Sequence, residues 1–205
     1  LVTEEPDAVT QKPTGAGVVF ISIFVFITFL FAPLSPTQVA MLVFTWLVML
    51  TGYLDDRSVH SWGEYLKGAM DLTLSFGASA IILYLYLHGS AHYWLPFTSV
   101  HVLVHPAVFL AISTIVLWVS INTTNCTDGV DGLSGTLVLL ALISLGIIFY
   151  FVLGHSKIAG YLLVPHLADG AQWAVLIFAL SGTLMGYLWH NAFPSKVLMG
   201  DAGSR

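Results

Sequence analysis

Long apolar runs separated by short polar stretches dominate the sequence, and their lengths suit a lipid bilayer. A helix needs about 20 predominantly apolar residues to cross the hydrocarbon core of a membrane. The pattern predicts six spanning helices, at about residues 16–34, 37–53, 66–88, 107–121, 133–153 and 172–189. Alternation from Ser99 to Val104 predicts a short hairpin around 92–105, outside the membrane. We therefore expect an all-α polytopic membrane protein, in which residues 1–205 form a single domain.

The composition excludes a soluble protein. Only 8% of the 205 residues are charged, whereas soluble domains carry about 25%, so too few charges are available to cover a surface that faces water. The single cysteine, Cys126, excludes an internal disulfide. The chain has no initial Met or signal peptide and stops in a Gly-rich polar stretch, so we expect a piece of a longer protein, cut at both ends. We expect membrane lipid and no nucleic acid among its partners.

The distribution of charge predicts how the helices are oriented. Loops rich in Lys and Arg face the cytoplasm. If residues 1–15 are cytoplasmic, the six predicted spans place five of the six Lys and Arg residues on the cytoplasmic side. Only Lys157 then lies on the opposite side. The same assignment brings five acidic residues to the cytoplasmic face, namely Asp55, Asp56, Asp128, Asp131 and Asp201.

These acidic residues lie at the ends of the second, fourth and sixth predicted helices, so a bundle can bring them together. Carboxylates that converge repel one another, and a divalent cation is their natural counter-ion. Oxygen ligands without accompanying imidazoles favour Mg²⁺, which commonly binds one or two carboxylates together with substrate phosphates. Lys12, Lys67 and Lys196 add positive charge nearby. The pattern predicts a site for a pyrophosphate and a metal at the membrane surface.

Simpler interpretations of the same residues stay open. Gly129 could end the fourth helix, and Asp131 could be the N-cap of the fifth. Lys67 could belong to a surface ladder of ion pairs with Glu64 and Asp71, which lie at helical spacing. The carboxylates could also bind the cation of a transporter, although such sites usually lie near the midplane of the membrane and not at helix ends.

Four motifs resemble those of one enzyme family, the polyprenyl-phosphate N-acetylhexosamine-1-phosphate transferases. Residues 125–133 (NCTDGVDGL) are similar to its N-x-T-D-G-x-D-G-L signature, and residues 52–56 to its G-x-x-D-D motif. Residues 194–204 resemble P-A-x-x-F-M-G-D-x-G-S, and residues 12–17 resemble K-x-x-x-P-T-M-G-G with the lysine moved next to the proline. Thr127 resembles the phospho-N-acetylmuramoyl-pentapeptide transferase branch. The resemblance covers the central six of the family's roughly ten spans, and a His-rich loop of that branch would lie beyond Arg205.

The resemblance implies a role for each motif. Asp55, Asp56 and Asp201 would be catalytic, and Asp56 would either deprotonate the lipid phosphate or only position it. Mg²⁺ would be held by Asp201 and Asp128. The residues that would bind the substrates are Lys12, Thr14, Lys67, Asn122, Asn125, Asp128, Asp131 and Asn191.

The implied reaction transfers phospho-N-acetylmuramoyl-pentapeptide from its UDP-linked form to undecaprenyl phosphate. It yields lipid I and UMP at the cytoplasmic face of the bacterial inner membrane, as the first membrane step of peptidoglycan synthesis. The alternative donor within the family is UDP-N-acetylglucosamine. The prenyl chain would lie in an apolar groove open to lipid. A homodimer is a candidate assembly, and we expect this piece alone to be inactive.

Overall fold

The chain folds into a bundle of helices in the computed structural model, which describes residues 12–58, 62–94 and 100–205. Its elements in chain order are α1 (Ala16–Phe31), α2 (Pro36–Arg57), α3 (Glu64–Ile81), η1 (Ile82–Tyr86), β1 (Ala91–Trp94), β2 (His101–Val104), α4 (Pro106–Thr127), α5 (Leu133–Ile147), η2 (Ile148–Leu153), α6 (Ser156–Leu162), α7 (Gly170–Asn191) and α8 (Asp201–Ser204). The short π-helices η1 and η2 continue α3 and α5 without a break. The predicted all-α class is confirmed.

Five of these helices are long and apolar enough to cross a membrane: Pro36–Arg57, Glu64–Tyr86, Pro106–Thr127, Leu133–Leu153 and Gly170–Asn191. Their outward faces are largely apolar, and in the spanning windows of α4 and of Leu133–Leu153 only 6% of residues are buried inside the protein. Apolar surface on this scale is unfavourable in water but suits contact with lipid. The chain is therefore a multi-pass membrane protein.

Helix boundaries differ from the predicted spans in ways that local chemistry explains. The first helix ends at Phe31, short of the predicted residue 34, because Pro33 restricts Ala32 to an extended conformation. The next begins sharply at Pro36, where Ser35 and Gln38 form a capping box. At the other end, α2 continues to Arg57 and α4 to Thr127. As a result, Asp55 and Asn125 lie on the last turns of helices and not in the following loops.

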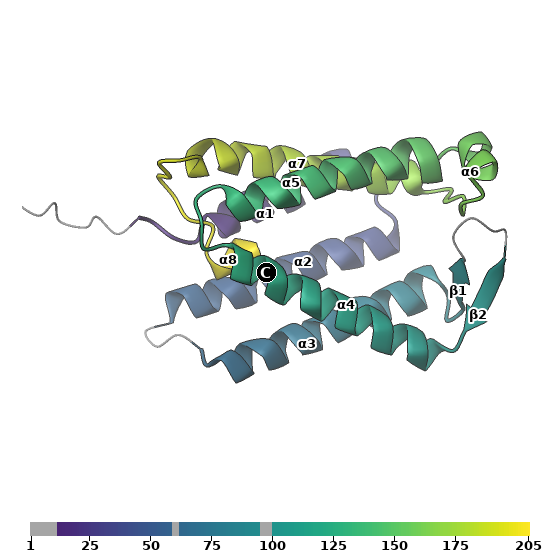
Figure 1. The fold of residues 1–205 in the computed structure, drawn as a ribbon, viewed down its shortest axis with the longest axis horizontal. Coiled ribbons are helices and arrows are strands. Elements are labelled where there is room, and N and C mark those ends of the chain that lie inside the picture. Colours follow the sequence, from purple (N-terminus) through teal and green to yellow (C-terminus); the bar gives the residue numbers. More distant parts are fainter. Residues whose placement is uncertain (1–11, 59–61, 95–99) are drawn as a thin grey trace, which may run out of the picture.

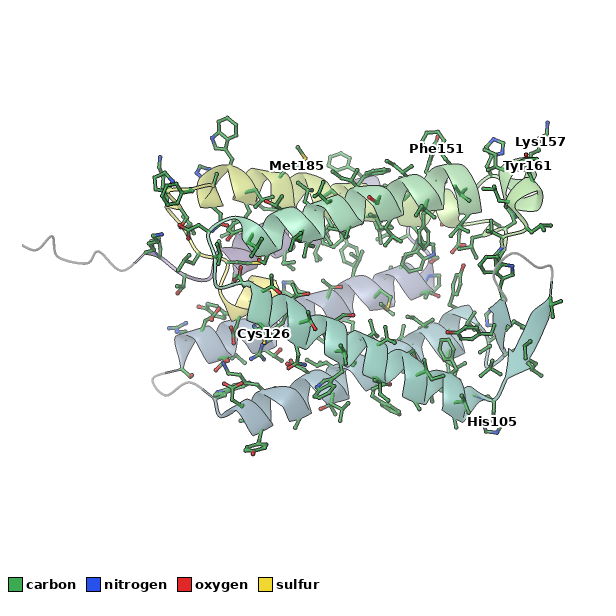
Figure 2. All side chains as sticks on the ribbon, in the orientation of Figure 1. His105, Cys126, Phe151, Lys157, Tyr161 and Met185 are labelled. Carbon is green, nitrogen blue, oxygen red and sulfur yellow. The ribbon has the colours of Figure 1, made fainter. Side chains whose placement is uncertain are left out.

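The bundle has two distinct ends (Figure 1). The hairpin and α6 lie at one end, and α8 lies toward the other, near the last turns of α2 and α4. Figure 2 shows Cys126 on the side that carries α8, far from Lys157 and Tyr161 on α6. Within the bundle, α3 packs against α4, and α7 packs against both α1 and α5.

The hairpin is short and antiparallel, as predicted from the alternation of residues. Ala91 pairs with Val104, and Trp94 pairs with His101. Residues 95–99, which include the start of the alternating stretch, lie outside the described residues.

The main core cluster lies beneath α8 and fixes its place in the bundle. Buried residues from α1, α2, α7 and the segment around α8 pack together: Phe20, Ile21, Met49, Leu184, Tyr187, Met199 and Ala202. Because Met199 and Ala202 flank Asp201, their burial holds that carboxylate at the end of the bundle.

Candidate active site

The short helix α8 is held by the acidic motif at the end of α2. Asp56 accepts hydrogen bonds from the backbone N–H groups of Asp201 and Ala202, both at 3.0 Å. Gly200 enters the turn with a φ of 71°, a conformation that favours glycine. Asp56, the second aspartate of the motif at residues 52–56, thus positions Asp201.

Gly52 lets α8 come close to α2. A methyl group at Gly52 would overlap the carbonyl group of Asp201 and the N–H of Ala202. Gly52 lies one turn before Asp55 and Asp56 on the same helix. The glycine of this motif therefore provides the room, and the aspartates provide the polar contacts.

Asp201, Asp55, Lys67 and Arg205 form the centre of the site. Lys67 Nζ lies 2.7 Å from Asp55 Oδ2 and 3.1 Å from Asp201 Oδ2. Arg205 Nη2 lies 3.0 Å and 3.1 Å from the same two oxygens. The Asp55 side chain is almost fully buried, and its Oδ1 accepts a hydrogen bond from the backbone N–H of Trp62 at 2.9 Å. Two cations thus bridge carboxylates that come from different motifs.

Asp56, Asp71 and Asn125 complete this group, which we call the Asp201 cluster: Asp55, Asp56, Lys67, Asp71, Asn125, Asp201 and Arg205. Asn125 donates through Nδ2 to Asp201 Oδ1 at 3.2 Å and to Ser204 Oγ at 2.9 Å. Asp71 Oδ1 pairs with Arg205 Nη1 at 3.6 Å. The cluster therefore joins α2, α3, α4 and α8.

The surroundings of Asp201 favour its charged form. Burial opposes the charge, but hydrogen bonds from Lys67 and Asn125 and the positive charge of Lys67 outweigh burial and lower the pKa of Asp201 to about 2. Asp201 is therefore ionised at neutral pH and available to bind a cation.

A second polar group lies beside the first. Lys12 Nζ is 3.1 Å from Asp131 Oδ2 and donates to Ser195 Oγ at 2.9 Å, and the N–H of Ser195 donates to Asp131 Oδ2 at 3.3 Å. Hydrogen bonds with Ser195 and Lys12 lower the pKa of Asp131. The N-cap of α5 is Gly132, with a φ of 74°, so the simpler interpretation of Asp131 as the N-cap is wrong. Its carboxylate instead joins the first and last motifs.

Asp128 lies just after α4, in the same loop as Asp131. Its Oδ1 accepts a hydrogen bond from Ser134 Oγ at 2.6 Å. Burial raises the pKa of Asp128, and the negative charges of Asp201 and Asp56 raise it further, although the Ser134 hydrogen bond opposes the shift. A carboxylate that is held in such a negative field gains from a bound cation.

Three predicted substrate-binding residues belong neither to the Asp201 cluster nor to the polar contacts of Lys12, Asp128 and Asp131 described above. Asn122 donates to the carbonyl of Trp118 within its own helix, at 2.8 Å. Asn191 is buried and bridges two loops, because it accepts from the N–H of Gly132 at 2.8 Å and donates to the carbonyl of Val197 at 2.9 Å. Thr14 is exposed beside a groove described below. Their contacts with substrate stay predictions.

The ladder of ion pairs on α3 does not form. Lys67 bonds to carboxylates of α2 and α8, and Asp71 pairs with Arg205. Neither Asp71 nor Arg205 was among the predicted site residues. One signal was present in the sequence, since Asp71 follows Lys67 by one turn and so lies on the same face of its helix.

The residues of the Asp201 cluster fit Mg²⁺ in chemistry and in charge. Carboxylate oxygens are the hard ligands that Mg²⁺ prefers. With each group ionised, the four carboxylates exceed the two cations by two charges, and the nearby Asp128 adds a third, so a bound divalent ion would offset most of this negative charge. Within residues 12–58, 62–94 and 100–205, no three His, Cys, Asp or Glu side chains converge in a metal-binding arrangement, and Lys67 and Arg205 bridge the carboxylates instead.

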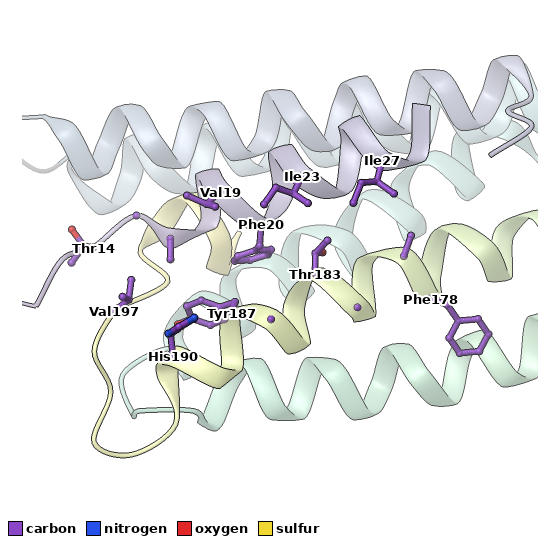
Figure 3. A pocket seen from close by; sticks show the side chains of 15 residues that line it. Thr14, Val19, Phe20, Ile23, Ile27, Phe178, Thr183, Tyr187, His190 and Val197 are labelled. Carbon is purple, nitrogen blue, oxygen red and sulfur yellow. The ribbon is translucent and has the colours of Figure 1, made fainter. Parts of the chain in front are cut away.

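A groove of about 790 Å³ runs between α1 and α7 (Figure 3). Its walls are apolar, with Val19, Ile23 and Ile27 on α1 facing Tyr187 and other residues on α7. No carboxylate lines it. The groove is of the kind predicted for the prenyl chain, and the carboxylates predicted to bind metal and phosphate are not part of its lining.

Comparisons with known proteins agree with this arrangement. The sequence model of glycosyl transferase family 4 matches residues 38–205. The phospho-N-acetylmuramoyl-pentapeptide-transferase of Treponema pallidum (strain Nichols) is 57% identical over 194 residues, which are 95% of this chain and 53% of that protein. The proteins of the same name from Campylobacter hominis and Aquifex aeolicus are 33% and 30% identical over 212 residues, covering 100% and 98% of this chain and 59% and 57% of theirs. The chain spans about half the length of the curated relatives that it matches.

Proposed function

The chain belongs to glycosyl transferase family 4, and from this we propose that the full-length protein transfers phospho-N-acetylmuramoyl-pentapeptide from its UDP-linked form to undecaprenyl phosphate. An oxygen of the lipid phosphate attacks the β-phosphorus of the nucleotide and forms a new phosphorus–oxygen bond. The bond from that phosphorus to the bridging oxygen breaks, and the oxygen leaves with UMP. The product is lipid I. The excess of basic residues on this side of the bundle supports an active site that faces the cytoplasm, in the bacterial inner membrane.

One observation carries the proposal. Asp55, Asn125 and Asp201 come from three separate motifs, and all three lie within one hydrogen-bonded group around Lys67 and Arg205. Charged groups inside a membrane protein are costly and mark functional sites. Motifs that converge in this way support a shared task, and the names of the relatives support phosphoryl transfer as that task.

The difficulty of this reaction is to bring two anionic phosphates together. A phosphate monoester is largely ionised at pH 7, since its second pKa is about 6, so the attacking oxygen does not need a strong base. Mg²⁺ held by Asp201 and Asp128 would supply charge neutralisation on the pyrophosphate. The known preference of Mg²⁺ for carboxylates and phosphates supports this assignment.

The chain's own cations would share that task. We assign Lys67 to the pyrophosphate, because its ammonium group already lies at the centre of the Asp201 cluster. Lys12 is 42% exposed and would bind phosphate from the side of Asp131. We assign Asp56 to positioning Asp201, since both of its oxygens accept hydrogen bonds from α8. The lipid phosphate is already ionised in this mechanism, so Asp56 does not act as a base.

The alternative donor, UDP-N-acetylglucosamine, is less well supported, because all three relatives described above carry the muramoyl-pentapeptide name. A cation transporter is also less well supported, since the carboxylates lie at helix ends and not midway along the spans. We retain a homodimer as the assembly to test by light scattering.

The test measures UMP release by the full-length protein in detergent with Mg²⁺ and undecaprenyl phosphate. We expect turnover with UDP-N-acetylmuramoyl-pentapeptide and little with UDP-N-acetylglucosamine. Asp201→Asn should reduce turnover at least 100-fold, a factor on the order of that found when a key electrostatic group is removed from an active site. Asp169→Asn, at the opposite end of the bundle, is the matched control and should retain activity. Undiminished turnover in Asp201→Asn would refute the role of Asp201.

A further inference from the structure

Asp71 and Arg205 are buried partners that the reaction as described does not use. The side chain of Arg205 is 1% exposed and that of Asp71 is 5% exposed. Arg205 Nη1 and Asp71 Oδ1 lie 3.6 Å apart, and neither atom has a hydrogen-bond partner among the described residues. A buried charge is costly unless an opposite charge lies beside it. Asp71 therefore depends on Arg205 for the opposite charge beside it.

Arg205 links this pair to the carboxylates of the site. Its Nη2 donates to Asp55 Oδ2 at 3.0 Å and to Asp201 Oδ2 at 3.1 Å. The guanidinium group is planar, with donors in fixed directions. When Asp71 attracts Nη1 from one side, it also fixes the direction in which Nη2 points. Asp71 thus holds Arg205, and Arg205 holds two carboxylates that belong to different helices.

The pair also takes part in the charge balance of the site. The Asp201 cluster contains four carboxylates, on Asp55, Asp56, Asp71 and Asp201, and two cations, on Lys67 and Arg205. Without Arg205 the cluster would carry one more negative charge, and without Asp71 it would carry one less. Removing both would restore the original balance.

We propose that Asp71 and Arg205 are positioning residues that orient Asp55 and Asp201 and set the net negative charge with which the cluster attracts a divalent cation. Neither residue contacts substrate in this role. The inference rests on the proposed function, because the cation concerned is that of the transferase.

The experiment measures Mn²⁺ binding to the metal-free, full-length protein in detergent, through the electron paramagnetic resonance signal of free Mn²⁺. Arg205→Met should bind Mn²⁺ more tightly and Asp71→Asn more weakly, each by roughly tenfold, as expected for one unit charge at short range in a protein. The double variant should return to within about threefold of the wild type. Arg205→Lys keeps the charge and should also stay within about threefold.

Controls separate this role from a contribution to folding alone. Arg57→Met removes an exposed guanidinium whose Nη1 donates to Tyr53, and Asp169→Asn alters a carboxylate at the far end; both should bind Mn²⁺ as the wild type does. UMP release should fall at least tenfold in Arg205→Met despite its tighter Mn²⁺ binding, and recover in part in Arg205→Lys.

The sign of the shifts decides the outcome. Loss of Mn²⁺ affinity in Arg205→Met, Asp71→Asn and the double variant alike would overturn the proposal, and so would unchanged affinity in all of them. Opposite shifts that cancel in the double variant cannot result from loss of the fold. If the wild type releases UMP but the variants do not show these shifts, the proposed role of Asp71 and Arg205 is refuted and the proposed transferase activity stands. If the variants show the expected shifts but no UMP is released, the transferase activity is refuted, and Asp71 and Arg205 still tune the affinity of a cation site.

Discussion

The carboxylate of Asp56 accepts a hydrogen bond from the backbone N–H of Asp201 at 3.0 Å, although the two residues are 145 positions apart in the chain. A second bond, from Ala202, reaches the other oxygen of the same carboxylate. Asp56 and Asp201 therefore differ in role. The Asp56 carboxylate binds the backbone of α8, whereas the Asp201 carboxylate contacts the cations Lys67 and Arg205.

This relationship predicts that Asp56 contributes to stability as well as to activity. Asp56→Ala leaves both N–H groups without a charged acceptor, whereas Asp56→Asn keeps one acceptor oxygen. We expect the alanine variant to lose ~1–2 kcal/mol of stability at this exposed position and the asparagine variant about half as much. Thermal unfolding in detergent measures the difference. Equal melting temperatures for the wild type and Asp56→Ala would contradict the prediction.

Gly52 should tolerate no side chain. In Gly52→Ala the new methyl group meets the carbonyl of Asp201, which is backbone and cannot swing aside, so α8 must move. We expect a loss of UMP release of at least tenfold. Gly160→Ala is the control on α6, away from the groove, where a methyl group meets nothing within 4 Å. That variant should be neutral or gain up to ~1 kcal/mol, the difference in helix propensity between glycine and alanine. Similar activities in the two variants would refute the proposed close approach.

The pKa shifts of Asp128 and Asp131 have opposite signs and predict opposite effects on stability. The raised pKa of Asp128 means that the folded state holds a proton more tightly than the unfolded state does, so stability falls as the pH rises from about 4, the value in an unfolded chain, through the folded pKa. Asp128→Asn removes this cost, so it should raise the melting temperature of the metal-free protein at pH 7 but not below pH 4.

Asp131→Asn serves as the control for this measurement. The lowered pKa of Asp131 contributes stability above the unfolded value, and this is lost as the pH falls through the folded pKa. The variant should therefore melt below the wild type at pH 7, and the difference should vanish toward acidic pH. Shifts of the same sign in both variants would contradict the two assignments.

Asp169 should matter for stability and not for the cation site. Its oxygens accept hydrogen bonds from Tyr86 Oη at 2.8 Å and Trp173 Nε1 at 2.7 Å, which tie η1 to α7 at the end of the bundle near the hairpin. Asp169→Ala leaves two partly buried donors unpaired, which costs roughly 1–3 kcal/mol for such a group. Thermal unfolding should show the loss, while Mn²⁺ affinity stays that of the wild type. A change in Mn²⁺ affinity would show that the two ends of the bundle are coupled.

Much of the architecture could be predicted from the sequence, because each span must satisfy its own backbone within the membrane. The same reasoning brought Asp55, Asp128 and Asp201 to one end, since alternate loops share a face. Contacts between side chains could not be predicted in this way. The pairing of Asp71 with Arg205 depends on how α3 is rotated and on the turn into α8, neither of which is encoded in apolar periodicity.

The first and last segments of the chain are joined across 183 residues by the hydrogen bond from Lys12 to Ser195, and Leu198 and Met199 bond to the backbone around Gly15. A ribosome adds about 5–20 residues each second, so these partners are made on the order of ten seconds or more apart. The earlier helices therefore enter the bilayer while the site does not yet exist. Assembly of the site thus waits for the segment around residues 195–201, and a chain interrupted before that segment would be inserted but inactive.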